Sequence, residues 1–270
     1  MPIDHYENFP VASVLLPARL RKPVEVIYRF ARSADDFADE GERPDQERLM
    51  LLASYGDELR MSERGERSRV PLFQELGAVI KQHQLPVQLL HDLLSAFAQD
   101  VSKKRYADYS EVLDYSRRSA NPVGRLLLAL YDAATPQNLR YSDNICSALQ
   151  IINFLQDVAI DHANGRIYLP QDELARFGVT EELIAARKVN DAWRSFMTFQ
   201  CNRTRRLLLE GAPLGGILKG RIGLEMRMII AGGDRILSKI AGVRYNVLRH
   251  RPVLRAWDWP LMLLHTLSIR

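Results

Sequence analysis

Apolar residues recur at helical spacing along most of this sequence. The clearest stretches are VEVIYRFARSADDFADE, LPVQLLHDLLSAFAQDV and SDNICSALQIINFLQDVAID, in which apolar side chains return every three or four positions. Strand signals are scarce, because no Asn-Gly or Asp-Gly pair lies between two alternating runs as in a β-hairpin. The pattern therefore predicts an all-α fold of roughly ten helices.

Prolines fall mostly between the helical stretches, where they mark helix starts. They are Pro23, Pro44, Pro71, Pro86, Pro136, Pro170 and Pro213. No linker, low-complexity segment or internal repeat divides the 270 residues, and the 47% hydrophobic and 26% charged composition is that of a globular protein. We therefore expect one domain over residues 1–270.

The net charge and the two cysteines limit the partners and the compartment. The formal charge of +4 suits an anionic substrate or an anionic membrane surface. The sequence contains no long Lys/Arg tract and no nucleic-acid motif, so a nucleic-acid partner is not expected. Cys146 and Cys201 lack metal-ligand spacing, which suggests a reducing compartment. There is no run of about 18 apolar residues, and the acidic N-terminus is unlike a signal peptide, so we expect a cytoplasmic protein.

One polar stripe runs along a helix that is otherwise apolar. Gln150, Asn153, Asp157 and Asp161 stand at i, i+3, i+7 and i+11, on one helix face. The other positions are largely apolar: Leu149, Ile151, Ile152, Phe154, Leu155, Val158 and Ile160. A surface helix has the opposite proportions. The pattern predicts a buried helix whose polar stripe faces something other than the core.

A second stripe of the same kind lies near the N-terminus. It consists of Tyr28, Arg32, Asp35, Asp36 and Asp39. A solvated acidic helix end is the alternative interpretation, because two further glutamates follow at positions 40 and 42. Two acidic stripes on buried helices predict facing walls of one cavity.

Oxygen ligands on rigid helices favour a hard cation. Zinc would require His or Cys, which neither stripe contains, and a di-iron site would require Glu-x-x-His pairs. Mg²⁺ is usually bound by a few carboxylates together with substrate phosphates. The sequence thus predicts Mg²⁺ between the carboxylates and a diphosphate, with Arg32 and Arg166 near enough to bind phosphate oxygens.

Three ordered motifs resemble those of the squalene/phytoene synthase family, and the resemblance covers nearly the whole chain. YRFARSADDFADE is similar to the first aspartate-rich motif of that family, with Tyr28, Arg32, Asp35, Asp36 and Asp39 in matching places. YSRRSANPVG is similar to the substrate-cavity helix and carries Tyr115, Ala120, Val123 and Gly124. QIINFLQDVAIDHANGRIYLP is similar to the second motif and carries Gln150, Asn153, Asp157, Asp161, Arg166 and Tyr168. The segment HYENFPVASVLLP, with Phe9, resembles the branch of bacterial hydroxysqualene synthases encoded in hopanoid clusters.

The resemblance implies an isoprenoid-synthase-like helical bundle around a central cavity. It implies Mg²⁺ held by Asp35, Asp36, Asp39, Asn153, Asp157 and Asp161, with these aspartates and Arg32 as the catalytic groups. It also implies a polyprenyl diphosphate substrate bound by Phe9, Tyr28, Tyr115, Ala120, Val123, Gly124, Gln150, Arg166 and Tyr168. The expected reaction ionises presqualene diphosphate, and water captures the rearranged cation to give hydroxysqualene without NADPH. Enzymes acting before and after it in the pathway are further expected partners.

The residues around Pro122 agree with a cavity helix. Proline inside a helical pattern predicts a kink, and Ala120 and Gly124 would leave room beside it for a polyprenyl chain. A plain break between two helices is the alternative. Phe9 and Tyr115, with Tyr168, would present aromatic faces that stabilise a carbocation, although core packing alone explains any single aromatic residue.

Two departures from the family pattern keep other functions open. Gln156 stands where related synthases commonly have Arg, and Asp234 stands where a Tyr is expected. The same-class alternative is a condensing enzyme that joins two farnesyl diphosphates, or a phytoene-type synthase. A non-catalytic assembly factor is the remote alternative, but both aspartate clusters are retained. Trp257 and Trp259, in the C-terminal apolar run, predict a docked helix, with peripheral contact at the inner membrane face as a second interpretation.

Overall fold

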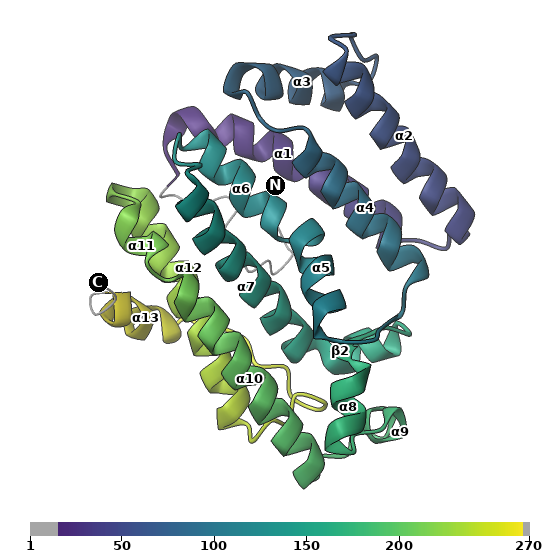
Figure 1. Ribbon diagram of the computed structural model, residues 1–270, viewed down its shortest axis with the longest axis vertical. Coiled ribbons are helices and arrows are strands. Elements are labelled where there is room, and N and C mark those ends of the chain that lie inside the picture. Colours follow the sequence, from purple (N-terminus) through teal and green to yellow (C-terminus); the bar gives the residue numbers. More distant parts are fainter. Residues whose placement is uncertain (1–15, 267–270) are drawn as a thin grey trace.

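The computed structural model describes residues 16–266, which form thirteen helices and one pair of short strands (Figure 1). The all-α prediction is confirmed. In chain order the elements are α1 (Ala18–Asp39), α2 (Asp45–Glu63), α3 (Pro71–His83), α4 (Gln88–Ser102), β1 (Arg105–Tyr106), α5 (Tyr109–Ser119), α6 (Asn121–Leu130), α7 (Pro136–Ala163), β2 (Ile167–Pro170), α8 (Gln171–Phe177), α9 (Glu181–Ala185), α10 (Asp191–Gly211), α11 (Leu214–Ile217), α12 (Gly220–Gly242) and α13 (Asp258–Thr266). None of the helices within 16–266 is long and apolar enough to cross a bilayer.

Most of the prolines begin helices as the sequence predicts. Pro44 and Pro170 immediately precede α2 and α8, and Pro71 and Pro136 occupy the first position of α3 and α7. Proline is tolerated there because the first backbone N–H groups of a helix have no intrahelical acceptor. Pro23 is the exception, since α1 already begins at Ala18 and continues through it.

The strand pair was not predicted from the sequence. β1 follows α4 and β2 follows α7, and the two run parallel, with the Ile167 amide donating to the Lys104 carbonyl at 2.9 Å. The turn at Gly165, where φ is +76°, directs the chain from α7 into β2. The pair therefore fastens the C-terminal ends of α4 and α7 side by side, which brings together residues that lie far apart in the sequence.

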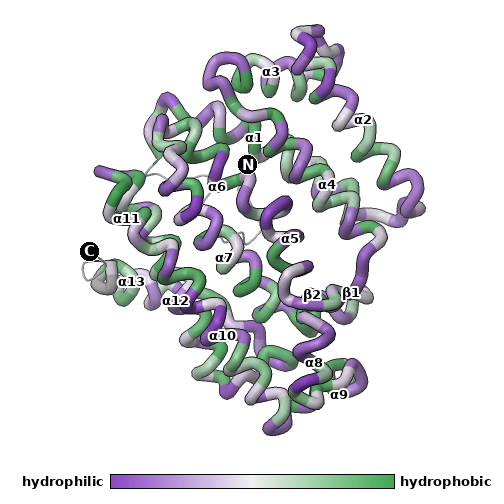
Figure 2. Tube along the Cα trace, in the orientation of Figure 1, coloured by the Kyte–Doolittle hydropathy of each residue, from purple (hydrophilic) through white to green (hydrophobic). Residues whose placement is uncertain are grey.

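The long helix α7 runs through the middle of the molecule (Figure 1). It packs against α10, α6 and α12, and its side chains at 149, 151, 152, 154, 155 and 158 are buried. The prediction of a helix that is buried nearly all round is thereby confirmed, and hydrophobic positions recur along its length (Figure 2). Ile160 is a correction, because it is 51% exposed near the end of the helix.

The apolar side chains form two separate cores. One core joins α7 to α10, α12 and the region around β2, and the other joins α1, α2, α3 and α4 to α6. In Figure 1 the first lies toward the green lower part of the ribbon and the second toward the purple and blue upper part. Helices α1 and α7 therefore belong to different cores and can face each other across the boundary.

The region of Pro122 differs from the predicted kink. Two helices, α5 and α6, meet at Ala120, and Pro122 lies in the first turn of α6. A proline in the first turn removes no intrahelical hydrogen bond, so the chain breaks cleanly rather than bending one helix. The alternative of a plain helix break is the correct one.

Gly124 packs closely against α7. A Cβ atom added at this position would lie 2.3 Å from Ser142 Oγ and 2.6 Å from Cys146 Sγ. The glycine is thus required for the close approach of α6 to α7. Gly124 is not among the residues that line the cavity, whereas its neighbour Val123 is, and its role in substrate binding stays a prediction.

The C-terminal helix α13 docks against α12, as one interpretation of the sequence predicts. Met262 is buried, and the fully buried Asp258 is bound by Arg235 and Lys239 of α12. The other side of this helix is apolar but exposed, and Trp259 on it and Trp257 just before it are more than half accessible to solvent.

Candidate active site

A cavity of about 550 Å³ lies at the boundary of the two cores. Its walls come from α1, α4, α5, α6, α7 and α12. One part of the lining is apolar, with Ile27, Val123, Leu127, Met226 and Ile229. The other part carries the polar stripes that the sequence analysis identified.

The α1 wall is the first of these stripes. Tyr28, Arg32, Asp35 and Asp39 line the cavity. Arg32 contacts two carboxylates of its own helix, Asp35 at 3.1 Å and Asp36 at 2.7 Å, and also Glu40 at 2.6 Å. Asp36 is not among the lining residues. The stripe is therefore a cavity wall, with a solvated acidic end just beyond it.

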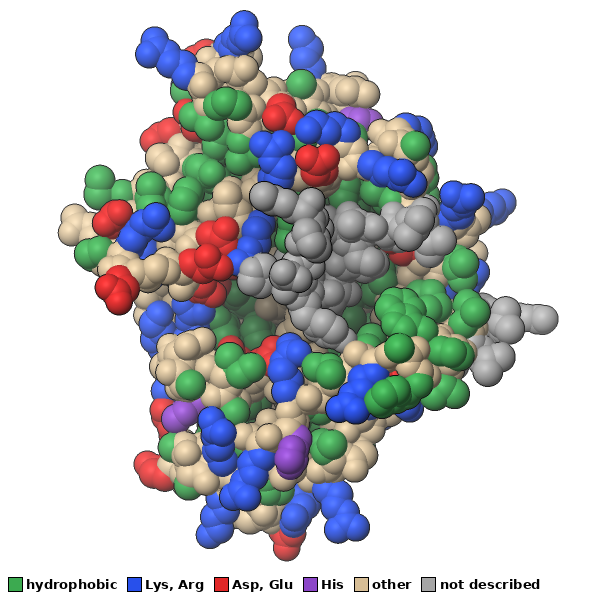
Figure 3. Space-filling model, turned by 180° about the vertical axis from the view of Figure 1, so that it is seen from behind, with side chains coloured by type: hydrophobic (Ala, Val, Ile, Leu, Met, Phe, Trp, Pro, Cys, Tyr) green, Lys and Arg blue, Asp and Glu red, His purple; other side chains and the backbone are tan. Residues whose placement is uncertain are grey.

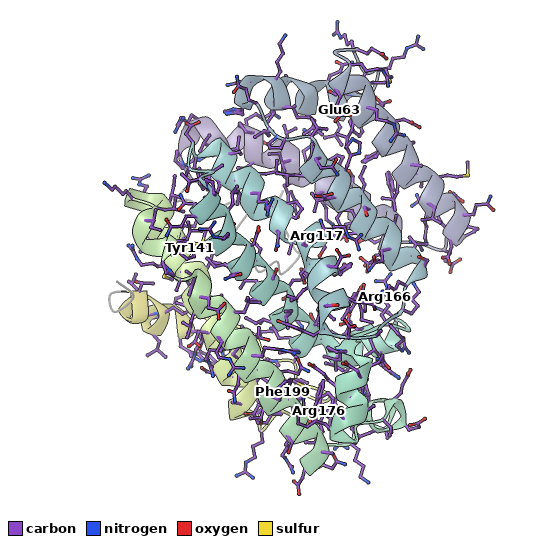
Figure 4. The ribbon with its side chains drawn as sticks, in the orientation of Figure 1. Glu63, Arg117, Tyr141, Arg166, Arg176 and Phe199 are labelled. Carbon is purple, nitrogen blue, oxygen red and sulfur yellow. The ribbon has the colours of Figure 1, made fainter. Side chains whose placement is uncertain are left out.

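The α7 wall is the second stripe. Gln150, Asn153 and Asp157 line the same cavity, while Asp161 lies one turn further along the helix and outside the lining. Near this end, Arg166 Nη2 donates to Asp39 Oδ1 at 2.6 Å and so links the two walls (Figure 4 labels Arg166). The predicted proximity of the two acidic clusters is thus present in the structure.

Keeping the carboxylates of the two clusters ionised in these positions costs free energy. Burial raises the pKa of Asp35 to about 7, and the charge of Asp39 adds to the shift. Burial likewise raises the pKa of Asp161 to about 8, with Asp157 as the second cause. Both clusters also lie in the last two turns of their helices, where the negative end of the helix dipole disfavours carboxylates. A cation placed between them would relieve these costs.

The donor chemistry fits a hard metal ion, although the carboxylates are held by arginines. Within residues 16–266, no three Asp, Glu, His or Cys side chains are close enough to share one metal ion. Instead Asp35 is paired with Arg32 and Asp39 with Arg166, so guanidinium groups balance the charge of these carboxylates. The available donors are carboxylate and amide oxygens, the ligand type that suits Mg²⁺.

Asp100 is a buried carboxylate that the sequence analysis missed. It lies in the last turn of α4, accepting hydrogen bonds from Tyr115 Oη at 2.6 Å and Tyr168 Oη at 2.9 Å. Burial raises its pKa to about 6, although both tyrosine hydrogen bonds oppose the shift. Tyr168 also stacks on Phe154 with the ring centroids 4.1 Å apart. Tyr168 is thus outside the lining and supports Tyr115, which is part of it.

Arg251 is the second residue that the sequence analysis missed. It lines the cavity and binds Asp157 through two contacts, one of which joins Nη2 to Oδ2 at 2.9 Å. The only sequence signal is its place in the basic stretch LRHRPVLR, which has no periodic relation to α7. Glu225 of α12 also lines the cavity and was not predicted.

The remaining predicted residues have mixed outcomes. Ala120 and Val123 line the cavity beside Tyr115, whereas Phe9 lies outside the described residues. The two departures are not lining residues either. Gln156 is buried, and Asp234 is paired with Arg205 of α10 at 2.6 Å.

Comparison with known proteins agrees with this geometry. The family model for squalene/phytoene synthase matches residues 4–258. The chain is 37% identical to a hydroxysqualene synthase of Rhodopseudomonas palustris over 87% of this chain and 79% of that protein. It is 34% identical to a phytoene synthase of Cereibacter sphaeroides over 85% of this chain and 68% of that protein.

A solved structure shows the same fold. The squalene synthase HpnC from Alicyclobacillus acidocaldarius superposes with a TM-score of 0.83 at 36% identity, covering 90% of each chain. The family match spans both acidic stripes and the helices that carry them. The chain therefore belongs to the squalene/phytoene synthase family, whose members are enzymes that use isoprenoid diphosphates.

Proposed function

We propose that this enzyme converts presqualene diphosphate and water into hydroxysqualene and diphosphate. The observation that carries the proposal is a single cavity with an apolar part and a part lined by carboxylates and arginines. Such a cavity suits a substrate with a long hydrocarbon tail and one anionic head. The likeness to the hydroxysqualene synthase of Rhodopseudomonas palustris supports this choice within the family.

The reaction balances without a reductant. The bond between carbon and the diphosphate oxygen breaks, and the electron pair leaves with diphosphate. The cyclopropylcarbinyl cation rearranges, water forms a new carbon–oxygen bond, and the released diphosphate is a candidate to accept the water proton. No hydride is consumed, so NADPH is not needed.

Diphosphate departure is where the polar walls would act. Mg²⁺, when bound by Asp35, Asp36, Asp39, Asn153, Asp157 and Asp161, supplies positive charge that stabilises the leaving group. Arg32, Arg166 and Arg251 stand beside these carboxylates, and their guanidinium groups match phosphate oxygens in geometry. The protein thus contributes fixed cations on both sides of the head group.

The apolar part of the cavity would protect the cation. Aliphatic side chains such as Val123 and Ile229 exclude bulk water, which would otherwise capture the cation before it rearranges. Tyr28 and Tyr115 line the same space and can stabilise positive charge through their ring faces.

Product analysis tests the proposal against the condensing alternative. The pure enzyme with Mg²⁺ receives presqualene diphosphate or farnesyl diphosphate, each with and without NADPH, and mass spectrometry identifies the products. We expect hydroxysqualene from presqualene diphosphate under both conditions and little product from farnesyl diphosphate. Efficient condensation of farnesyl diphosphate would favour the condensing synthase. No turnover of either substrate would favour the non-catalytic assembly factor.

We also propose that the enzyme contacts an anionic bilayer through α13. Trp257, Trp259, Leu261 and Leu263 are each at least half exposed on this segment. Arg255 and Lys239 lie 5.0 and 6.0 Å from the Trp257 ring centroid. Of the six Lys and Arg in residues 235–263, Arg244, Arg249 and Arg255 are exposed, whereas Arg235 and Lys239 are paired with the buried Asp258 and Arg251 with Asp157. Tryptophan flanked by cations is suited to the interface of a membrane with negative lipids. Hydrophobic and basic side chains gather on this side of the molecule, at the right of Figure 3.

A further inference from the structure

The chain between α12 and α13 approaches the cavity without regular structure. Residues 250–255 form neither helix nor strand, and Arg251 within them lines the cavity. Two side chains from neighbouring helices hold the backbone there. Gln156 Nε2 of α7 donates to the Pro252 carbonyl at 2.7 Å, and Lys239 Nζ of α12 donates to the Val253 carbonyl at 2.7 Å.

Gln156 is an unusual residue for its surroundings. It is 1% exposed on the apolar side of α7, and its Oε1 atom has no hydrogen-bond partner within the described part of the chain. Leaving a buried polar atom unpaired costs roughly 1–3 kcal/mol. The amide therefore has a use at this position that an aliphatic residue could not provide, namely the donor to Pro252.

Two consecutive residues of α7 contact two consecutive residues of the segment after α12. Gln156 holds Pro252, and the next residue of α7, Asp157, holds Arg251. Gln156 faces the core and Asp157 faces the cavity. The hydrogen bond to Pro252 thus fixes the backbone from which the Arg251 side chain projects.

We propose that Gln156 is a positioning residue that keeps Arg251 at the diphosphate end of the cavity. The inference rests on the proposed function, in which that end receives a diphosphate. Arg251 can turn from Asp157 to a phosphate oxygen and remain in the site only while the Pro252 backbone stays in place. An amide also provides the donor without adding a positive charge next to Asp157.

The position of Arg251 can be read directly by NMR. The Arg251 Nε–H signal is assigned by its loss in Arg251→Gln, and Asp157→Asn gives the signal of a released guanidinium. We expect Gln156→Met, which keeps the volume and removes the donor, to move the signal toward that released position. Asn138→Leu is the matched control, because the buried Asn138 of α7 also donates to a backbone carbonyl, that of Ala133 at 2.8 Å. An unmoved Arg251 signal in Gln156→Met overturns the proposal.

Calorimetric binding of inorganic diphosphate with Mg²⁺ tests the consequence. We expect Gln156→Met to bind about fivefold more weakly, equivalent to one net hydrogen bond, and Asn138→Leu to bind like wild type. The double variant Gln156→Met/Arg251→Gln should bind no more weakly than Arg251→Gln alone, because Gln156 acts through Arg251. Additive losses would overturn the positioning role. If the wild-type enzyme does not bind diphosphate, the proposed function is overturned instead. A moved Arg251 signal in Gln156→Met would then show only that Gln156 supports the ion pair between Arg251 and Asp157.

Discussion

The two acidic walls of the cavity obtain their cations in different ways. On α1, Arg32 lies one turn before Asp35 and Asp36, so the helix supplies the cation for its own carboxylates. On α7, Asp157 is bound by Arg251, which lies 94 residues later in the chain. The Asp35 side chain is 38% exposed, whereas that of Asp157 is 22% exposed. Apart from Asp39, which Arg166 binds from beyond the end of α7, the α1 wall is thus built locally, whereas the pairing of Asp157 depends on tertiary structure.

This difference predicts which wall is more sensitive to change. Helical spacing alone keeps Arg32 near its partners in any state in which α1 is formed. The pairing of Asp157 with Arg251 requires that the C-terminal segment be docked on α7. Changes at the C-terminus should therefore affect the α7 wall before the α1 wall.

The largest expected effect is loss of turnover when the α7 wall loses a charge. Asp157→Asn should lower kcat at least tenfold, which corresponds to about 1.4 kcal/mol of barrier, because one of the carboxylates proposed to bind the metal is neutralised. Hydroxysqualene formed from presqualene diphosphate is the measurement. Removal of divalent metal with EDTA should abolish the activity, and added Mg²⁺ should restore it.

Asp143→Asn is the matched control for this change. Asp143 lies on the same helix and is also bound by an arginine, Arg125 at 2.6 Å, but is outside the cavity lining. Its replacement should leave kcat within about twofold of wild type, because the pair lies outside the cavity lining and a partly exposed ion pair contributes little to stability. Full turnover by Asp157→Asn, or by a metal-free preparation, would contradict the role of this wall in catalysis.

The next effect concerns the packing that holds α7 in place. Gly124→Ala should destabilise the protein by about 1–3 kcal/mol, since the added methyl group meets Ser142 and Cys146 of α7 at less than van der Waals distance. Gly242→Ala is the control, because a Cβ atom there meets nothing within 4 Å. Thermal unfolding measures both. Equal stability of the two variants would mean that the α6–α7 contact relaxes at little cost.

The sequence predicted the parts of the site that follow helical periodicity. All of the α1 stripe except Asp36 and all of the α7 stripe except Asp161 line the cavity, because residues spaced by three or four share a helix face. The helical class and most helix starts could be predicted for the same reason.

The sequence could not predict contacts between distant elements. Asp100 meets Tyr168 only because β1 and β2 align the ends of α4 and α7, and Arg251 meets Asp157 across 94 residues. The close packing of Gly124 against α7 could not be predicted either, because a small residue beside a helix break suits close helix packing as well as an open cavity. Pattern alone does not distinguish these two uses of a glycine.

A smaller effect is expected at the far anchor of the C-terminal segment. Asp258 is fully buried, and although burial alone would raise its pKa, hydrogen bonds from Lys239, the Arg255 amide and Arg235 bring it to about 2. Asp258→Asn should therefore destabilise the protein by about 1–3 kcal/mol near neutral pH. In calorimetry the difference should be complete above the unfolded-chain pKa of about 3.9 and should disappear as the pH falls toward 2.

The Asp258 variant also tests the dependence of the two walls. Loosening of the C-terminal segment should shift the NMR signal of Arg251 and leave that of Arg32 unchanged. Equal shifts of both signals would contradict the distinction between a locally built wall and one that depends on tertiary structure.

The smallest expected effect is on membrane binding, in which the same C-terminal segment is proposed to contact the bilayer. Replacement of both Trp257 and Trp259 by Ser should weaken sedimentation with phosphatidylglycerol vesicles by about threefold or more, because two half-exposed aromatic anchors are removed. Met50→Ser is the control, since Met50 is 66% exposed on α2, at the opposite side of the molecule (Figure 1). Binding should also fall with added salt and be weak on phosphatidylcholine vesicles, because the exposed arginines of the segment are attracted by a negative surface. Unchanged binding by the double variant would exclude α13 as the contact, and equal binding to both kinds of vesicle would exclude charge recognition. If neither vesicle binds the wild type, α13 is not a membrane contact, and the C-terminal segment then serves only to hold Arg251 at the α7 wall.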